Sequence, residues 1–185
     1  MNLDRIYTSK FGTSQDVKSL GWGSEHSQNI RFKILMEIAG YTEGDSVLDV
    51  GCGHGDLSKL IKNYTGLEIR KEAIDVAKVK YPETKFIHGI IKDVHDQYDW
   101  VFGSGIFCFK KDWHDHLDVT VKKMFDLSTK GIAFNLLSAN TPKKKDHDMK
   151  YVKIPDIVSF VTKFTMKFQI RHDYLPNDMT IYMYK

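Results

Sequence analysis

The sequence contains little cysteine. Cys52 and Cys108 are the only two among 185 residues. Two cysteines cannot build the disulfide framework that stabilises many secreted domains. Reduced thiols are the usual state in a cytoplasm, and we therefore expect a cytoplasmic protein with two free cysteines.

Long apolar runs are also absent. No run approaches the ~20 residues that a membrane-spanning helix requires. The first ten residues, MNLDRIYTSK, lack the apolar core of a secretory signal. The sequence therefore predicts neither a membrane span nor a signal peptide.

An excess of one charge is missing as well. The chain has 27 basic and 24 acidic residues, for a net charge of +3. Nucleic-acid-binding proteins usually concentrate basic residues more strongly. The three consecutive lysines at 143–145 are flanked by Asp146 and Asp148, which favours an exposed loop over a phosphate-binding patch. A contact of this loop with RNA or another anion stays open as an alternative.

Only four prolines interrupt the chain, and its length suits one domain. We predict a single domain over residues 1–185, with an N-terminal helical segment at 1–44 and a core at 45–185. Within this chain, short apolar runs alternate with amphipathic stretches. The predicted helices are 24–40, 55–63, 71–81, 111–128 and one near 154–163. The predicted strands are 46–50, 64–69, 84–89, 98–105 and 131–139, followed by a hairpin of 165–174 and 179–185.

This alternation predicts an α/β fold with a mostly parallel sheet covered by helices on both faces. The first strand, SVLDV, runs into the loop GCGHG. A dinucleotide fingerprint needs a third glycine three residues after the second, and Asp56 stands there instead. Because Asp49 and Asp56 flank the loop and would repel a phosphate, a ligand with a cationic end and no phosphate fits better.

The stretch from Asp49 to Gly55, DVGCGHG, resembles the D/E-x-G-x-G-x-G signature of class I S-adenosylmethionine-dependent methyltransferases. The resemblance continues at Glu68, where the family places an acidic residue for the ribose hydroxyls. It extends over residues 46–139 and includes the C-terminal hairpin. It implies a Rossmann-like, doubly wound sheet of about seven strands, the last one antiparallel. It also implies S-adenosylmethionine as methyl donor and S-adenosylhomocysteine as product.

The resemblance suggests roles for residues of the donor site. Asp49 is expected to orient the loop and the methionine ammonium group. Gly51, Cys52 and Gly53 form the loop, where the two glycines let the backbone approach the ligand. Glu68 is expected to hold the ribose.

The adenine end departs from the family pattern. Ile90 stands where the family commonly has an acidic residue. Either Asp93 supplies that carboxylate after a small shift, or apolar walls and the backbone N–H of Ile91 hold the adenine; we favour the second. Ile69 and Ile91 would then enclose the ring.

At the methyl-bearing end we expect Ser104 and Gly105, with Phe107 at the mouth of the acceptor site. No catalytic residue can be assigned, although His54, His172 and Tyr7 have suitable chemistry for a base. Tyr7, Phe11 and Trp22 precede the core. They could either pack against the sheet or belong to a lid over the methyl donor.

The stretch DWHDHLD at 112–118 has the composition of a metal site. On a helix, His114 shares a face with Asp118 and not with His116. Two ligands do not make a zinc site, so we predict no metal.

The methyl acceptor is the part that the sequence leaves open. We favour a small molecule, because the chain has little beyond the donor-binding core. A methyltransferase acting on RNA or protein, or a non-catalytic S-adenosylmethionine-binding module, are the alternatives. The oligomeric state cannot be inferred.

Overall fold

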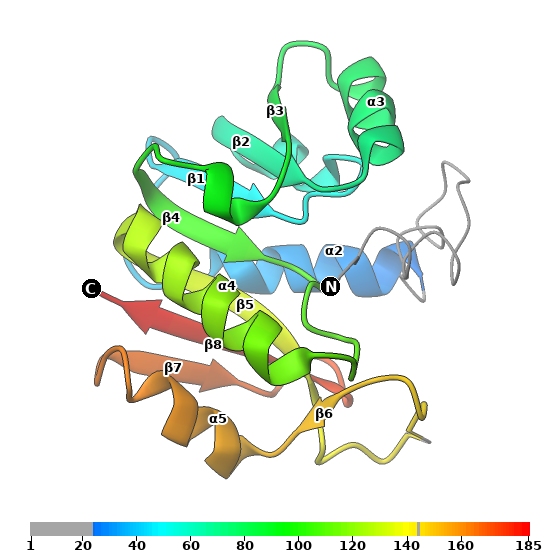
Figure 1. The fold of residues 1–185 in the computed structure, drawn as a ribbon, viewed down its shortest axis with the longest axis vertical. Helices are drawn as coiled ribbons and strands as arrows, with labels where there is room; N and C mark the ends of the chain where they lie inside the picture. Colours follow the sequence, from blue (N-terminus) through cyan, green and yellow to red (C-terminus); the bar gives the residue numbers. More distant parts are fainter. Residues whose placement is uncertain (1–23, 144) are drawn as a thin grey trace.

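Eight strands form one mixed sheet in the computed structural model, which describes residues 24–143 and 145–185. The strand order is β3-β2-β1-β4-β5-β8-β7, and the short β6 pairs with the end of β5 (Figure 1). The strands are β1 Ser46–Val50, β2 Asn63–Glu68, β3 Lys85–His88, β4 Tyr98–Gly103, β5 Ser128–Ser138, β6 Tyr151–Val152, β7 Phe168–Arg171 and β8 Asp178–Tyr184.

Most of the sheet is parallel. β1 to β5 run in one direction, and β8 is antiparallel to both of its neighbours, β5 and β7. The doubly wound, mostly parallel architecture with a closing antiparallel hairpin is therefore confirmed. The sequence did not reveal β6, since two residues are too few to show a period.

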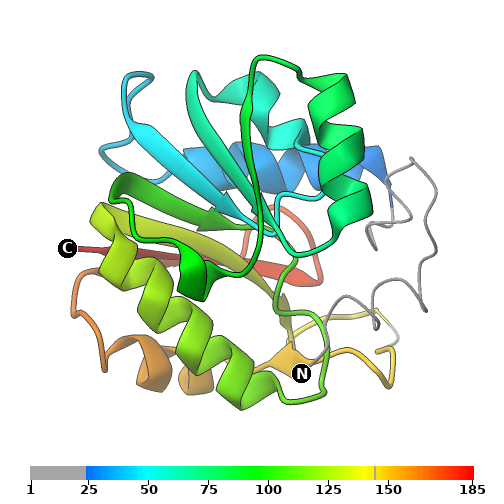
Figure 2. The same cartoon turned by 45° about the horizontal axis from the view of Figure 1, so that its top comes forward.

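Helices cover both faces of the sheet. They are α2 Glu25–Met36, α3 Lys71–Lys80, α4 Trp113–Leu127 and α5 Ile154–Val161, with 3-10 turns η2 Asp56–Leu60 and η3 Ile91–Asp93. Figure 2 shows α4 and α5 on one side of the sheet and α2 on the other. The helices are held by two apolar clusters, because alternate residues of each strand face opposite sides. One cluster contains the buried side chains of α4 and the other contains those of α2. In β4, Val101 packs in the first cluster, whereas Trp100 and Phe102 pack in the second.

Two of the predicted helices differ most from the structure. α2 begins after the predicted cap Ser24, whose hydroxyl accepts from Ser27 N–H, and ends at Met36 rather than near Gly40. The predicted helix 55–63 is wrong: only the 3-10 turn η2 forms. Gly55 has a left-handed backbone (φ 78°), and Ile61 is already extended ahead of β2. Little more than one turn therefore fits between the glycine loop and the second strand.

None of the helices within the described residues is long and apolar enough to cross a membrane. Residues 1–23 of the predicted N-terminal segment, with Tyr7, Phe11 and Trp22, lie outside the described residues.

Candidate functional site

A cavity of about 800 Å³ opens at the carboxyl ends of the parallel strands. Its floor is the point where β1 has β2 on one side and β4 on the other. Doubly wound sheets bind ligands at this switch point. All the residues predicted for the donor site line this cavity: Asp49, Gly51, Cys52, Gly53, Glu68, Ile69, Ile90, Ile91, Ser104 and Gly105. Their roles in ligand binding remain predictions.

The glycine loop after β1 is held against β2. The backbone N–H groups of Gly51 and Cys52 both donate to the carbonyl of Leu67, at 2.7 and 3.0 Å. Gly51 has a φ of 73°, and a Cβ there would lie 2.4 Å from Cγ2 of Ile106. Glycine is therefore required at this position both for its backbone conformation and for the close approach of the next loop.

Glu68 joins the end of β2 to the same loop. Its carboxylate accepts hydrogen bonds from Gly53 N–H at 3.1 Å and from Arg70 N–H at 2.9 Å. The residue is 8% exposed, and burial raises the pKa of its carboxyl group while these backbone bonds oppose the rise. The carboxylate is thus fixed in place at the wall of the cavity.

Asp49, at the end of β1, is a second buried carboxyl group in the cavity wall. Burial raises its pKa to about 7, the negative charge of Glu68 adds to the rise, and a hydrogen bond from Tyr64 opposes it. Two buried acids with raised pKa values would both be stabilised by a nearby cation. The part of the cavity wall that Asp49 and Glu68 form therefore favours a cationic group over a phosphate.

Asp56 does not contribute to this electrostatic preference as the sequence suggested. Its carboxylate accepts from Lys80 at 2.5 Å and from Tyr81 at 2.7 Å, and it does not line the cavity. Of the acidic residues near the glycine loop, Asp49 and Glu68 are the two that face the ligand cavity.

The predicted adenine end is apolar. Ile69, Ile90 and Ile91 line the cavity, whereas Asp93 is exposed and lies outside its lining. This arrangement supports apolar walls over the carboxylate of Asp93 as the adenine contact.

The loop after β4 is fixed by β5. Gly105 N–H donates to Oδ1 of Asn135 at 2.8 Å, and the Asn135 amide contacts Oγ of Ser104 at 3.4 Å. Phe107 is buried at 1% exposure and also lines the cavity, in a T-shaped contact with Phe134. Ser104 and Gly105 are thus held at the cavity edge between β4 and β5.

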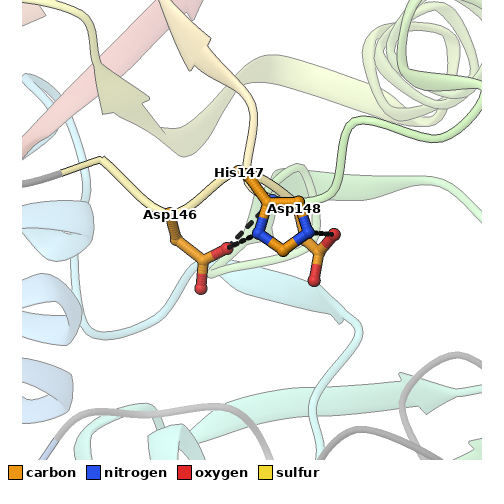
Figure 3. Close-up of side chains that lie close together, drawn as sticks. All are labelled: Asp146, His147 and Asp148. Atoms are coloured by element: carbon orange, nitrogen blue, oxygen red, sulfur yellow. Dashed lines mark hydrogen bonds and ion pairs between the residues drawn. The ribbon is translucent and has the colours of Figure 1, made fainter.

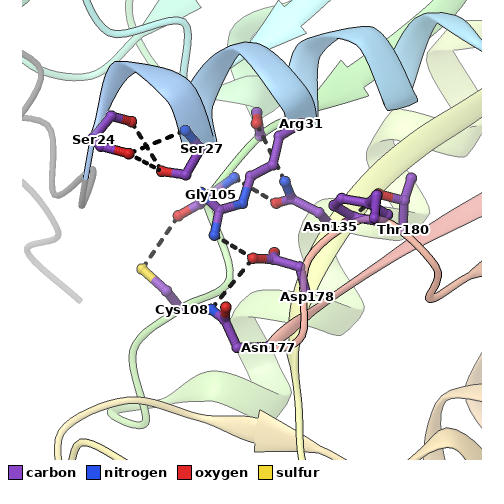
Figure 4. A network of polar contacts seen from close by, with 11 residues as sticks. Ser24, Ser27, Arg31, Gly105, Cys108, Asn135, Asn177, Asp178 and Thr180 are labelled. Carbon is purple, nitrogen blue, oxygen red and sulfur yellow. Dashed lines mark hydrogen bonds and ion pairs between the residues drawn. The ribbon is translucent and has the colours of Figure 1, made fainter. Parts of the chain in front are cut away.

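The sequence analysis missed a polar group on the far wall of the cavity. Arg31 of α2 forms a buried ion pair with Asp178 at the start of β8 (Figure 4). Gln28 lies one turn earlier on α2 and also lines the cavity. A signal was present in the sequence, since Gln28 and Arg31 fall on the face of the helix that also carries Phe32 and Leu35. Asp178 lies between the two predicted hairpin strands, 165–174 and 179–185, where the sequence gives no reason to expect a partner on α2.

Neither of the two histidines considered as a base lines the cavity. His54 is 3% exposed and His172 contacts Oγ of Ser138 at 2.7 Å, and neither belongs to the cavity lining. Tyr7 lies outside the described residues. His116, which was not a candidate, does line the cavity, with Nε2 3.1 Å from the carbonyl of Ile106.

Within the described residues, one exposed cluster could supply three metal ligands: Asp146, His147 and Asp148 (Figure 3). His147 Nε2 lies 3.0 Å from the Asp148 carboxylate. Asp118 and His114, considered from the sequence, are both exposed on α4. Exposed acidic clusters are common without an ion, and none of these groups carries a metal assignment.

Comparison with known proteins agrees with this geometry. A family model described as "Methyltransferase domain" matches residues 48–122. A Mycobacterium tuberculosis protein described as a candidate methyltransferase is 24% identical over 166 residues, which cover 81% of this chain and 99% of that protein. The ubiquinone biosynthesis O-methyltransferase of Shewanella halifaxensis is 36% identical over 108 residues, or 52% of this chain and 44% of the relative. The chain thus spans less than half the length of the second relative.

The fold also matches a solved methyltransferase. The plantazolicin methyltransferase, solved in complex with a triazolic desmethylPZN analogue and S-adenosylhomocysteine, superposes with a TM-score of 0.69 at 13% identity. The superposition covers 99% of this chain and 94% of that one. The match of residues 48–122 to the methyltransferase-domain family, the strand order and the glycine loop agree with the resemblance to the class I S-adenosylmethionine-dependent methyltransferases.

Proposed function

We propose that this methyltransferase transfers the methyl group of S-adenosylmethionine to a small-molecule acceptor and releases S-adenosylhomocysteine. The observation that carries the donor site is the pair of buried carboxyl groups, Asp49 and Glu68, in the wall that the glycine loop completes. S-adenosylmethionine carries an ammonium and a sulfonium group and no phosphate, and therefore suits this charge. When bound, it supplies an electrophilic methyl group.

Each wall of the cavity has a distinct role in this proposal. Glu68 accepts the ribose hydroxyls, and Asp49 attracts the ammonium group. The apolar side chains of Ile69, Ile90 and Ile91 enclose the adenine. Ser104 and Gly105 then border the methyl end, so that the acceptor enters from the side of α2 and β8. Holding the two reactants in one closed site is the main way in which proteins accelerate such a transfer.

A small acceptor is supported by the position of the remaining cavity. Beyond the predicted donor site, the lining continues over α2, α4 and the segment 143–151. Relatives described as ubiquinone biosynthesis O-methyltransferases and the plantazolicin methyltransferase also act, by their names, on small molecules. We also propose a cytoplasmic location, because two cysteines make no disulfide framework. Residues 1–185 are proposed to form a single domain.

Calorimetric titration with S-adenosylhomocysteine, S-adenosylmethionine and NAD tests the donor site. The wild-type protein is expected to bind the first two and not NAD. Glu68→Ala should weaken binding at least tenfold, since a hydrogen bond to a charged group contributes about 1.5–3 kcal/mol. Glu72→Ala is the matched control, because Glu72 is an exposed carboxylate on the neighbouring α3.

A second readout comes from stability. At a hundredfold excess over the dissociation constant, a ligand of the folded state should stabilise it by about 2.7 kcal/mol. If the folded wild-type protein binds neither adenosyl ligand, the proposed function is wrong. Tight binding of RNA that weakens with salt would instead favour the alternative acceptor.

A further inference from the structure

Two buried side chains of the cavity have hydrogen-bonding atoms without a partner. Gln28 is 4% exposed, and its side-chain amide makes no hydrogen bond within residues 24–143 and 145–185. Asp178 is 2% exposed and accepts from Arg31, and at 3.5 Å from Asn177, only through Oδ2. Within the same part of the chain its Oδ1 has no partner. Neither group is among the side-chain atoms that are sealed from solvent without a partner, so both are open to the cavity, where a polar group of a ligand can reach them.

These atoms lie near the predicted methyl end of the donor site. Asn135, which accepts from Gly105 N–H, is paired in register with Thr180 across β5 and β8. Asp178 precedes Thr180 by two residues and therefore faces the same side of the sheet, about 7 Å along the strand. Figure 4 shows Asp178 directed toward Arg31, with Asn135 and Gly105 close by. An acceptor between Gly105 and Asp178 would thus be adjacent to the methyl group.

The charge of this wall restricts the acceptor group. The free Oδ1 of Asp178 is a hydrogen-bond acceptor, so it requires an O–H or N–H donor and repels a carboxylate. Arg31 already neutralises the carboxylate, which removes the attraction for an ammonium group. A hydroxyl group fits both conditions. As it loses its proton, the negative charge developing on its oxygen is stabilised by the Arg31 guanidinium.

We propose that this end of the cavity binds a small hydroxyl-bearing acceptor and that Asp178 is the catalytic residue that accepts its proton. The inference rests on the proposed function. The hydroxyl oxygen attacks the methyl carbon and forms an O–C bond, while the S–C bond breaks and its electron pair stays on sulfur. The hydroxyl proton passes to Oδ1 of Asp178 and then to water. The Gln28 amide binds a second polar group of the acceptor.

The test measures S-adenosylhomocysteine formation from S-adenosylmethionine with matched sets of small aromatic and aliphatic compounds, identical except for a hydroxyl, amino or methoxy group. The wild-type protein should methylate hydroxyl members and not their amino counterparts. Asp178→Asn should lower kcat about 10²- to 10⁴-fold, the range of a lost general base. Asp156→Asn, an exposed carboxylate on α5, is the control.

Gln28→Met provides an independent variant with nearly the same side-chain volume. It should raise KM for the hydroxyl acceptor about tenfold and leave kcat nearly unchanged, because a binding contact is lost. This variant keeps the proposal testable if Asp178→Asn does not fold.

Titration with S-adenosylhomocysteine distinguishes a failure of the proposed function from a failure of the acceptor inference. If the wild-type protein does not bind this ligand, the proposed function fails. If it binds, the acceptor inference is overturned by preferred turnover of amines, by wild-type rates in folded Asp178→Asn, or by no turnover of any hydroxyl compound.

Discussion

The phenol of Tyr64 on β2 donates a 2.7 Å hydrogen bond to the carboxylate of Asp49 on the adjacent β1. The two residues are buried beside the glycine loop, and the strands that carry them pair in parallel register. The bond favours the ionised form of Asp49, whereas burial disfavours it and raises the pKa to about 7. The protonation state of the donor site thus changes near neutral pH.

This pKa makes the stability of the ligand-free protein depend on pH. Between about pH 4 and 7, folded Asp49 keeps a proton that the unfolded chain has released, since an unperturbed Asp has a pKa of about 3.9. The free energy of unfolding should therefore fall as pH rises through this window. The Asp49 contribution is about 1.4 kcal/mol for each unit by which the two pKa values differ.

Asp49→Asn isolates this contribution. Glu68, whose pKa is also raised, likewise makes the free energy of unfolding fall as pH rises. His116, whose pKa is lowered by burial, makes it rise with pH. Urea unfolding at several pH values between 5 and 8 should show a shallower decline for the variant than for the wild type. Equal slopes would mean that Asp49 is ionised in the folded protein throughout the window.

Donor affinity should respond to the same group in the opposite direction. An ammonium group near Asp49 favours the ionised carboxylate, so the affinity for S-adenosylhomocysteine should increase as pH rises toward 7 and then level off. Tyr64→Phe removes a bond that favours ionisation and should move this rise to higher pH. Calorimetry at a series of pH values gives the pH at which the rise in affinity is half complete. If this pH is the same in Tyr64→Phe and the wild type, the Tyr64 hydrogen bond does not determine it.

The glycine loop should tolerate no side chain at position 51. Gly51→Ala places a Cβ 2.4 Å from Ile106 Cγ2 and forces alanine to a φ of 73°. A left-handed conformation alone costs about 1–2 kcal/mol, and the overlap adds to this cost. We expect a loss of at least ~2 kcal/mol in unfolding free energy and weaker S-adenosylhomocysteine binding.

Gly44→Ala is the matched control for this substitution. A Cβ at Gly44 meets nothing within 4 Å, and its backbone does not require glycine. Its effect on stability should stay within about 0.5 kcal/mol. Comparable losses in the two variants would contradict the role given to Gly51.

The grouping of the predicted donor residues around one cavity could be inferred from sequence because these residues lie close together in the chain. DVGCGHG and Glu68 lie on two successive strands, and parallel pairing brings their carboxyl ends together. The wall with Arg31 and Asp178 could not be predicted in this way, since 147 residues separate the two side chains. Only the packing of α2 across the sheet against β8 joins them. The predicted helix 55–63 was wrong because its apolar periodicity does not show that Gly55 takes a left-handed conformation and that the chain is already extended at Ile61.

The Arg31–Asp178 pair should be important for stability as well as for the proposed acceptor site. The pair is buried, and it connects α2 to β8. Arg31→Met would leave the carboxylate of Asp178 without a counterion at 2% exposure. Breaking a buried pair by removing one partner costs about 3–5 kcal/mol, so we expect a loss in this range in denaturant unfolding. Lys122→Met, at the exposed Lys122–Asp126 pair of α4, should cost less than about 1 kcal/mol.

The double variant Arg31→Met/Asp178→Asn distinguishes an unpaired charge from lost packing. If the isolated carboxylate causes the loss, removing its charge should recover part of the stability, so that the double variant unfolds at higher denaturant than Arg31→Met alone. If the two substitutions simply add, the lost contacts of the arginine side chain are responsible, and the pair would be a packing contact between α2 and β8 rather than an electrostatic one.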